Sequence, residues 1–277
     1  MPTIRKIAAA TMTVAAGVMV PAVAVSPAGA ETAANPAYVA YHAANAGRHA
    51  TYVKTLTKQG YRPITINVSD GGKYAAVWIR RSGPAWGIYH EMSYPAYLRR
   101  YANFIKKGYQ PISVSATGSG SSVKFAAIFE KKSVKFQTRY NISADQFASI
   151  NQKLSSAGYV LTSVDVYGGA GKPRYVGVWT ANPGGSWFYT AGKTAAQHQA
   201  EYVNRTKQGF RPTQVAVGPD GMYTAVWRKD GLRSWSHFIE MSSSGYQWRF
   251  DQQRARGLYP VQVNSENGRY AAVFVKT

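Results

Sequence analysis

The chain has 277 residues, and its 33 Lys and Arg residues outnumber its 12 Asp and Glu residues, which gives a formal net charge of +21. This excess of positive charge favours anionic partners, but it does not choose among nucleic acid, teichoic acid and membrane headgroups. The chain contains no cysteine, and this excludes disulfide bonds, thiolate metal sites and a cysteine nucleophile.

The first 30 residues have the three-part pattern of a secretory signal peptide. Arg5 and Lys6 form a short basic region, an apolar run follows over residues 7–25, and small residues lead up to Ala30. The pattern predicts cleavage after Ala30 and a secreted, extracellular protein. A membrane anchor is the alternative, but Pro21 interrupts the run, and no later stretch is long and apolar enough to cross a bilayer.

Cleavage at this point would leave a strongly basic mature chain. Removal of Arg5 and Lys6 lowers the formal charge only to +19. A secreted eukaryotic protein of this size usually carries disulfide bonds, so the lack of cysteine favours a bacterial origin.

Beyond a short linker at residues 31–35, the chain repeats one unit of about 48 residues five times. Each unit contains an aromatic anchor, then a segment like "GYRP", then a segment like "KYAAVW". The predicted unit boundaries are 36–83, 84–133, 134–184, 185–232 and 233–277. We therefore expect residues 36–277 to form a single repeat domain, with no separate catalytic domain among them.

A helix is predicted between the first and second anchors of each unit. In the second unit, Ser93 stands at the N-cap position, Pro95 lies in the first turn, and apolar residues recur at helical spacing from Tyr97 to Ile105. Gly108 follows as the residue that ends the helix with a positive φ. The other units place a glycine at the same point: Gly60, Gly158, Gly209 and Gly257.

Strands are predicted in the rest of the unit. An alternating segment follows "GYRP", a Gly-rich turn comes next, and "KYAAVW" is apolar on both faces, which is typical of a buried strand. The anchor could form a third strand, which makes the unit β-α-β-β. Such a unit is too small to bury its own apolar face, so we expect neighbouring units to supply the core.

These elements predict an α+β fold in which five units form a closed or nearly closed, toroidal, propeller-like array. An open arc is the alternative. Closure is favoured because neither end has a polar capping unit. The last unit ends in the strand "RYAAVFVKT", so we expect the anchor strand "PAYVAYH" of the first unit to complete its sheet.

The "GYRP…YAAVW" unit resembles the bacterial tandem repeat of secreted actinobacterial proteins, and also the amino-terminal repeat domain of fungal polyglycine hydrolases. The third unit departs from the pattern with "GYVL" and "YVGVW". In those hydrolases the repeats accompany a β-lactamase-like catalytic domain, which this chain lacks. The resemblance implies a non-catalytic role in engaging a substrate or a surface, and it assigns no functional residue.

The sequence offers little sign of catalytic chemistry. The S-x-x-K match at Ser121–Lys124 lies in a predicted turn rather than on a helix, and its usual companion motifs are absent. Glu91 and Glu240 occupy equivalent positions in "HEMS" and "IEMS", but a glycosidase needs two carboxyl groups that face each other. We expect no cofactor, and whether the protein is an enzyme is left open.

Histidines and aromatic residues at equivalent positions are the candidate binding residues. His42 and His90 are equivalent, either as hydrogen-bonded residues between units or as a paired metal site, and the former is favoured because the H-E-x-x-H spacing is missing. The anchor aromatics either pack between units or form a repeated stacking platform for sugars, peptides or bases. They are Tyr38, Trp86, Phe136, Trp187 and Trp235.

The function that these features favour is a secreted, non-catalytic binding protein. Its basic and aromatic surfaces would engage an extracellular or cell-wall polymer, or a protein partner. Nucleic acid is a weaker candidate because no nucleic-acid-binding motif is present. The alternatives are a secreted, peptidase-like hydrolase related to polyglycine hydrolases, and a structural role at a spore surface.

Overall fold

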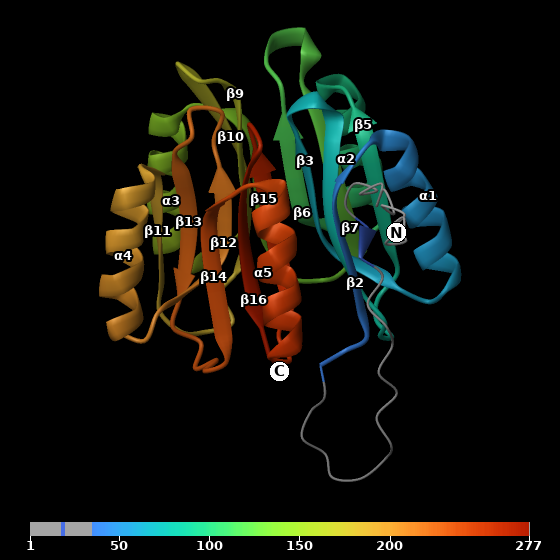
Figure 1. Ribbon diagram of the computed structural model, residues 1–277. Coiled ribbons are helices and arrows are strands. Elements are labelled where there is room, and N and C mark those ends of the chain that lie inside the picture. Colours follow the sequence, from blue (N-terminus) through green and yellow to red (C-terminus); the bar gives the residue numbers. More distant parts are fainter. Residues whose placement is uncertain (1–17, 20–34, 277) are drawn as a thin grey trace, which may run out of the picture.

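The computed structural model describes residues 18–19 and 35–276 (Figure 1). Two residues of the expected signal peptide are among them, as the short strand β1 (Val18–Met19), which pairs with β2. The rest of residues 1–30 lies outside the described residues, so the signal peptide stays a prediction. None of the described helices is both long enough and apolar enough to span a membrane.

Residues 38–275 form five β-α-β-β units, as the sequence predicts. The first unit contains β2 (Tyr38–Ala44), α1 (Ala46–Lys58), β3 (Arg62–Ser69) and β4 (Lys73–Ile79). The second contains β5 (Trp86–Met92), α2 (Tyr94–Lys106), β6 (Tyr109–Thr117) and β7 (Lys124–Lys131), and the third β8 (Phe136–Ile142), α3 (Ala144–Ser156), β9 (Tyr159–Gly169) and β10 (Lys172–Ala181). The fourth contains β11 (Trp187–Lys193), α4 (Ala195–Lys207), β12 (Arg211–Val217) and β13 (Tyr223–Arg228), and the fifth β14 (Trp235–Met241), α5 (Ser243–Ala255), β15 (Tyr259–Glu266) and β16 (Arg269–Val275).

The three strands of each unit form one antiparallel sheet with the "KYAAVW"-type strand in the centre. In the first unit the order is β2-β4-β3, and the other four sheets repeat it. The expectation that the first anchor strand completes the last sheet is wrong, because β2 pairs with β4 while β16 pairs with β14 and β15. The fifth unit has its own anchor strand, which already occupies that edge.

The helices begin and end as the sequence predicts. Ser93 is the N-cap of α2, although its side chain makes no capping hydrogen bond, whereas Ser143 Oγ accepts one from the backbone N–H of Gln146. The glycine after each helix has a φ of 76–82°, a conformation that glycine adopts without a steric penalty. These glycines are Gly60, Gly108, Gly158, Gly209 and Gly257.

Each sheet is buried on both faces, one against its own helix and one against a neighbouring unit. In the first sheet Ala76 and Trp78 lie in one cluster with Leu56 of α1, whereas Ala75 and Val77 pack against residues of the fifth unit. Figure 1 shows the helices on the outside of the molecule and the strands between them. The core therefore runs through the sheets from unit to unit.

The second strand of each unit, which we call an inner strand, contacts the inner strands of neighbouring units. These strands are β3, β6, β9, β12 and β15, and contacts join each to the next as well as β15 to β3. Side chains of one inner strand accept hydrogen bonds from the backbone of another. The backbone N–H of Ile66 donates to Ser113 Oγ at 3.2 Å, and that of Ser265 donates to Asn67 Oδ1 at 3.0 Å.

Candidate binding sites at the unit junctions

Aromatic and histidine rings pack within each unit and across its junction with the next. One aromatic or histidine in the first turn of each helix packs against an aromatic at the start of the central strand, with ring centroids 4.4–5.6 Å apart. The pairs are His49 with Tyr74, Tyr97 with Phe125, Phe147 with Tyr175, His198 with Tyr223, and Tyr246 with Tyr270. A ring on the anchor strand of the next unit packs against each of these helix rings, with centroids 4.7–5.8 Å apart. Rings at these separations contribute packing energy beyond the burial of their area, so the junctions are structural cores.

The predicted anchor aromatics are half-buried at these junctions. Trp86 packs edge-on against Trp78 of the preceding unit at 5.7 Å, and Tyr38 packs against Tyr259 of the fifth unit at 5.5 Å. Phe136, Trp187 and Trp235 are half-buried as well. Packing between units accounts for the contacts of Tyr38 and Trp86, and the partly exposed edges of the five anchors leave room for a stacking role.

The two candidate histidines lie at different junctions. His42 lies against Tyr246 of the fifth unit, and its Nε2 is 3.3 Å from Gln247 Oε1. His90 packs edge-on against His49 of the first unit. The structure therefore does not bring His42 and His90 into one metal site.

A closer histidine pair joins the fourth and fifth units. His198 Nε2 lies 2.8 Å from His237 Nε2. Burial lowers the pKa of His198 to about 4 and that of His237 to about 3, so both rings are neutral at pH 7. Sequence reasoning missed this pair, although the place of His198 in the first helical turn, equivalent to His49, was a signal for it.

Glu91 and Glu240 lie at the first and fourth junctions and do not face each other. Each has a positive φ, 53° and 55°, at the bulge that ends its anchor strand. Tyr74 donates its hydroxyl to Glu91, and Tyr223 does the same to Glu240. These carboxylates hold neighbouring units together, and the pair lacks the geometry of a glycosidase.

The S-x-x-K match does not have the geometry of a serine nucleophile. Ser121 lies in a short 3-10 turn (Gly120–Ser122), and Lys124 opens the strand β7. The Lys124 ammonium lies 3.5 Å from Glu91 Oε2. The pair is therefore not on one helical turn, as that chemistry requires.

A buried polar network links the inner strands, and sequence reasoning missed it. Asp165 accepts hydrogen bonds from Ser115 Oγ of the second unit at 2.5 Å and from Asn264 Nδ2 of the fifth unit at 2.8 Å. Burial raises the pKa of Asp165 to about 6, and burial together with the Asp165 carboxylate raises the pKa of Glu266 to about 8. Polar residues at alternate positions of four of the five inner strands, all but β12, were the available signal.

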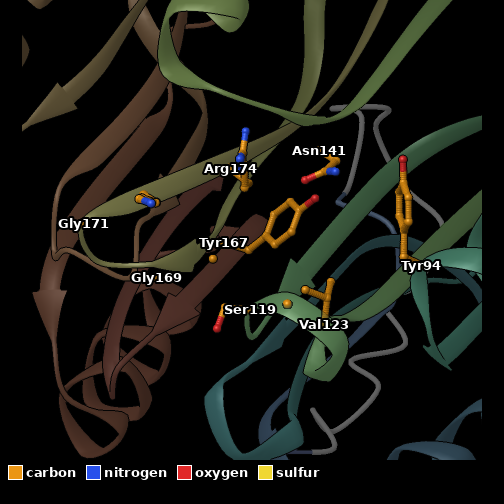
Figure 2. A pocket seen from close by; sticks show the side chains of 11 residues that line it. Tyr94, Ser119, Val123, Asn141, Tyr167, Gly169, Gly171 and Arg174 are labelled. Carbon is orange, nitrogen blue, oxygen red and sulfur yellow. The ribbon is translucent and has the colours of Figure 1, made fainter.

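Two further features come from the structure alone. A cavity of about 600 Å³ opens at the junction of the second and third units, lined among others by Tyr94, Tyr167 and Arg174 (Figure 2). Trp248 on α5 is 54 % exposed, and the Arg249 guanidinium lies 4.5 Å from its ring. Trp248 lies between the buried positions 246 and 250 of α5, so a helical projection of the sequence could have shown it as exposed.

Five antiparallel three-stranded units, each backed by a helix and joined by aromatic junctions, define a tandem-repeat protein. A family model described as "polyglycine hydrolase-like, structural repeat" matches the chain five times, at residues 35–81, 83–132, 133–182, 184–230 and 233–277. The chain belongs to this family of structural repeats. The resemblance inferred from the repeated motifs is thereby confirmed.

Proposed function

We propose that this chain is a secreted, non-catalytic binding protein that engages an anionic extracellular or cell-wall polymer through its outer basic and aromatic surfaces. The observation that carries the proposal is the excess of exposed basic side chains over exposed acidic ones on the described surface. A protein partner with an acidic surface is the second kind of ligand that this surface suits.

Some of the acidic side chains are buried, and others are paired with basic residues. Glu130, Asp165 and Glu266 are buried. Glu91, Glu201, Asp230 and Glu240 form ion pairs with basic residues. Asp70, Asp145, Asp220 and Asp251 stay exposed without an ion pair among the described residues, but exposed basic side chains outnumber them.

Several of the exposed basic side chains lie on the outer helices and at their ends. Arg99, Arg100 and Lys106 of α2 are exposed, as is Lys107 at its C-cap. At the end of α5 the C-cap residue Arg256 is exposed, and on the helix Arg249 lies beside the exposed ring of Trp248. A surface that combines free cations with an aromatic ring can attract a polyanion and stack against planar or sugar groups.

We further propose that the five units close into a toroidal array, so that the helices present these cations around an outer rim. The contact between β15 and β3 supports closure, as does the bond from the Ser265 backbone to Asn67. Tyr38 of the first unit also packs against Phe250 and Tyr259 of the fifth. A ring of this kind would allow several helices to contact one extended polymer at once.

Binding to purified cell wall tests the proposed function. The protein without residues 1–30 should sediment with wall that carries teichoic acid and should be released as salt is raised, because salt screens exposed charges. Wall from which teichoic acid has been extracted should bind much less protein. Failure to bind any anionic polymer at low salt would refute the proposal.

A hydrolase function is the alternative that the family description raises. Ser121 and Lys124 lie in a turn and a strand, which does not favour it. A serine-directed fluorophosphonate probe should leave the purified protein unlabelled. Labelling that is lost in Ser121→Ala would instead support the hydrolase.

A further inference from the structure

The five junctions can be compared at three equivalent positions: the first aromatic of the central strand, the residue with positive φ in the next unit, and the basic residue that opens that unit's central strand. At the first junction these are Tyr74, Glu91 and Lys124. The tyrosine hydroxyl and the lysine ammonium both contact the carboxylate, the ammonium at 3.5 Å. At this junction the Glu91 carboxylate of the protein itself therefore occupies the position between the hydroxyl and the ammonium.

The fourth junction is closed in the same way. Tyr223 donates its hydroxyl to Glu240, and Arg269 Nη1 lies 3.4 Å from Glu240 Oε1. The chain therefore builds the same arrangement of a tyrosine, a carboxylate and a cation twice.

The second junction has the cation without the carboxylate. Its three residues are Phe125, Asn141 and Arg174, and Asn141 has the same positive φ, 55°, as the two glutamates. Within residues 35–276, no carboxylate forms an ion pair with Arg174. A half-buried guanidinium without a counterion is an anion-binding group.

The cavity of about 600 Å³ lies at this junction, and Asn141 and Arg174 line it. Figure 2 shows the Tyr167 ring between them, with its hydroxyl directed toward Asn141. Burial raises the pKa of Tyr167, and the backbone N–H of Asn141 and the Arg174 charge oppose this. Tyr167 thus supplies the hydroxyl that Phe125 lacks at this junction.

The remaining walls suit a ligand with a flat or apolar part beside its charge. Tyr94 and Val123 line one side, and Lys172 adds a second cation. Gly169 and Gly171 leave open space where a side chain would project. No Asp or Glu is among the lining residues that the structure describes.

We propose that this cavity binds the carboxylate of a small organic acid or of a chain terminus, which takes the place that Glu91 and Glu240 occupy at the other two junctions. The Arg174 guanidinium and the Tyr167 hydroxyl hold the carboxylate, and the Tyr94 ring contacts the part of the ligand next to it. The cavity is lined by Tyr94 at the start of α2 but by none of the basic residues of α2 or α5, so this site goes beyond the proposed polymer binding.

The other two junctions do not offer the same site. At the third, Gly192 and Met222 occupy the equivalent positions, so there is no cation. At the fifth, Ala43 has the positive φ, and the cation is the exposed Lys73 rather than a half-buried arginine. His42 packs there between the Tyr246 and Tyr270 rings. Arg174 therefore differs from the cations of the other junctions in being at once half-buried, without an ion pair among the described residues, and in the wall of the cavity.

Titration with benzoate, and with neutral benzamide as the matched probe, tests the proposal by NMR or calorimetry. Benzoate should bind saturably and benzamide should bind at least about tenfold more weakly, since a charge-assisted bond is lost. Asn141→Glu installs the internal carboxylate and should abolish benzoate binding while the protein stays folded. Arg174→Gln should weaken binding by about tenfold or more, whereas Arg269→Gln at the fourth junction should not change it.

Two further probe pairs distinguish the sources of the carboxylate. Acetyl-dialanine with a free or an amidated end represents a peptide terminus, and glucuronate with its methyl ester represents an acidic sugar. Tighter binding of the free acid in either pair supports the site and identifies the source. The proposal is overturned if no carboxylate binds saturably, or if Asn141→Glu and Arg174→Gln bind benzoate as the unmodified protein does. Polymer binding to the outer helices can survive that result, so the two proposals fail separately.

Discussion

The inner strands and the outer helices use charge in opposite ways. The inner strands bury Asp165 and Glu266 in a hydrogen-bonded network that joins units far apart in the sequence. The helices leave Arg99 and Lys106 of α2 exposed. The difference implies that substitutions of buried residues should alter stability without altering polymer binding. Substitutions of exposed basic residues on the helices should alter polymer binding without altering stability.

The largest effect on stability is expected from Trp179→Ala. Trp179 is fully buried, and its indole N–H donates to Asn151 Oδ1 at 2.9 Å. Loss of a buried aromatic ring costs about 3–5 kcal/mol of unfolding free energy, which denaturant unfolding can measure. Whatever protein remains folded should bind anionic polymer normally. Weaker binding by the folded fraction would show that the interior and exterior are not independent.

Asp165→Ala should have the next largest effect. It leaves Ser115, Asn264 and the backbone N–H of Ala116 without their acceptor, and unsatisfied buried donors cost about 1–3 kcal/mol. Asp165→Asn is the matched control, because the amide keeps one acceptor and the same shape, so it should be less destabilising. If the two variants unfold at the same denaturant concentration, the network does not link the units.

Glu266→Gln should change how stability depends on pH. The folded state raises the pKa of Glu266 to about 8, so the folded protein holds a proton that the unfolded chain releases near pH 4.5. Stability from this group is full at low pH and is lost as pH rises through 8, by at most about 1.4 kcal/mol per pH unit. The stability of Glu266→Gln relative to the unmodified protein should therefore rise between pH 5 and 8, measured as the difference in melting temperature. A constant difference would contradict the raised pKa.

The smallest effect on stability is expected from the triple variant Arg99→Gln, Lys106→Gln and Lys107→Gln. These side chains are exposed, so the unfolding free energy should change by no more than about 0.5 kcal/mol for each change. Binding to wall that carries teichoic acid should nevertheless weaken. The matched control neutralises no charge and changes three exposed polar residues near the end of α3: Gln152→Ala, Ser155→Ala and Ser156→Ala.

Much of the fold follows from local sequence. The repeated glycines, the helical stripe from Tyr97 to Ile105 and the alternating strands are set by short-range backbone and burial preferences, and the structure confirms them. The prediction that the first anchor strand completes the sheet of the fifth unit is wrong, because the periodicity of a strand does not say which sheet edge it joins. The candidate sites were harder still. The hydrogen bond between Asp165 and Asn264 spans 99 residues of sequence. That Arg174 has no carboxylate partner among the described residues can be recognised only when the junctions are compared in the structure.

The salt dependence of binding to purified teichoic acid tests the central claim most directly. The affinity of the mature chain should fall steeply as NaCl is raised from about 50 mM to about 500 mM, because exposed cations on the helices make the contacts. The α2 triple variant should show a lower affinity and a shallower dependence, while the α3 control should match the unmodified chain. Binding that is absent at low salt, or that is the same for both variants, would contradict an outer basic surface as the binding surface.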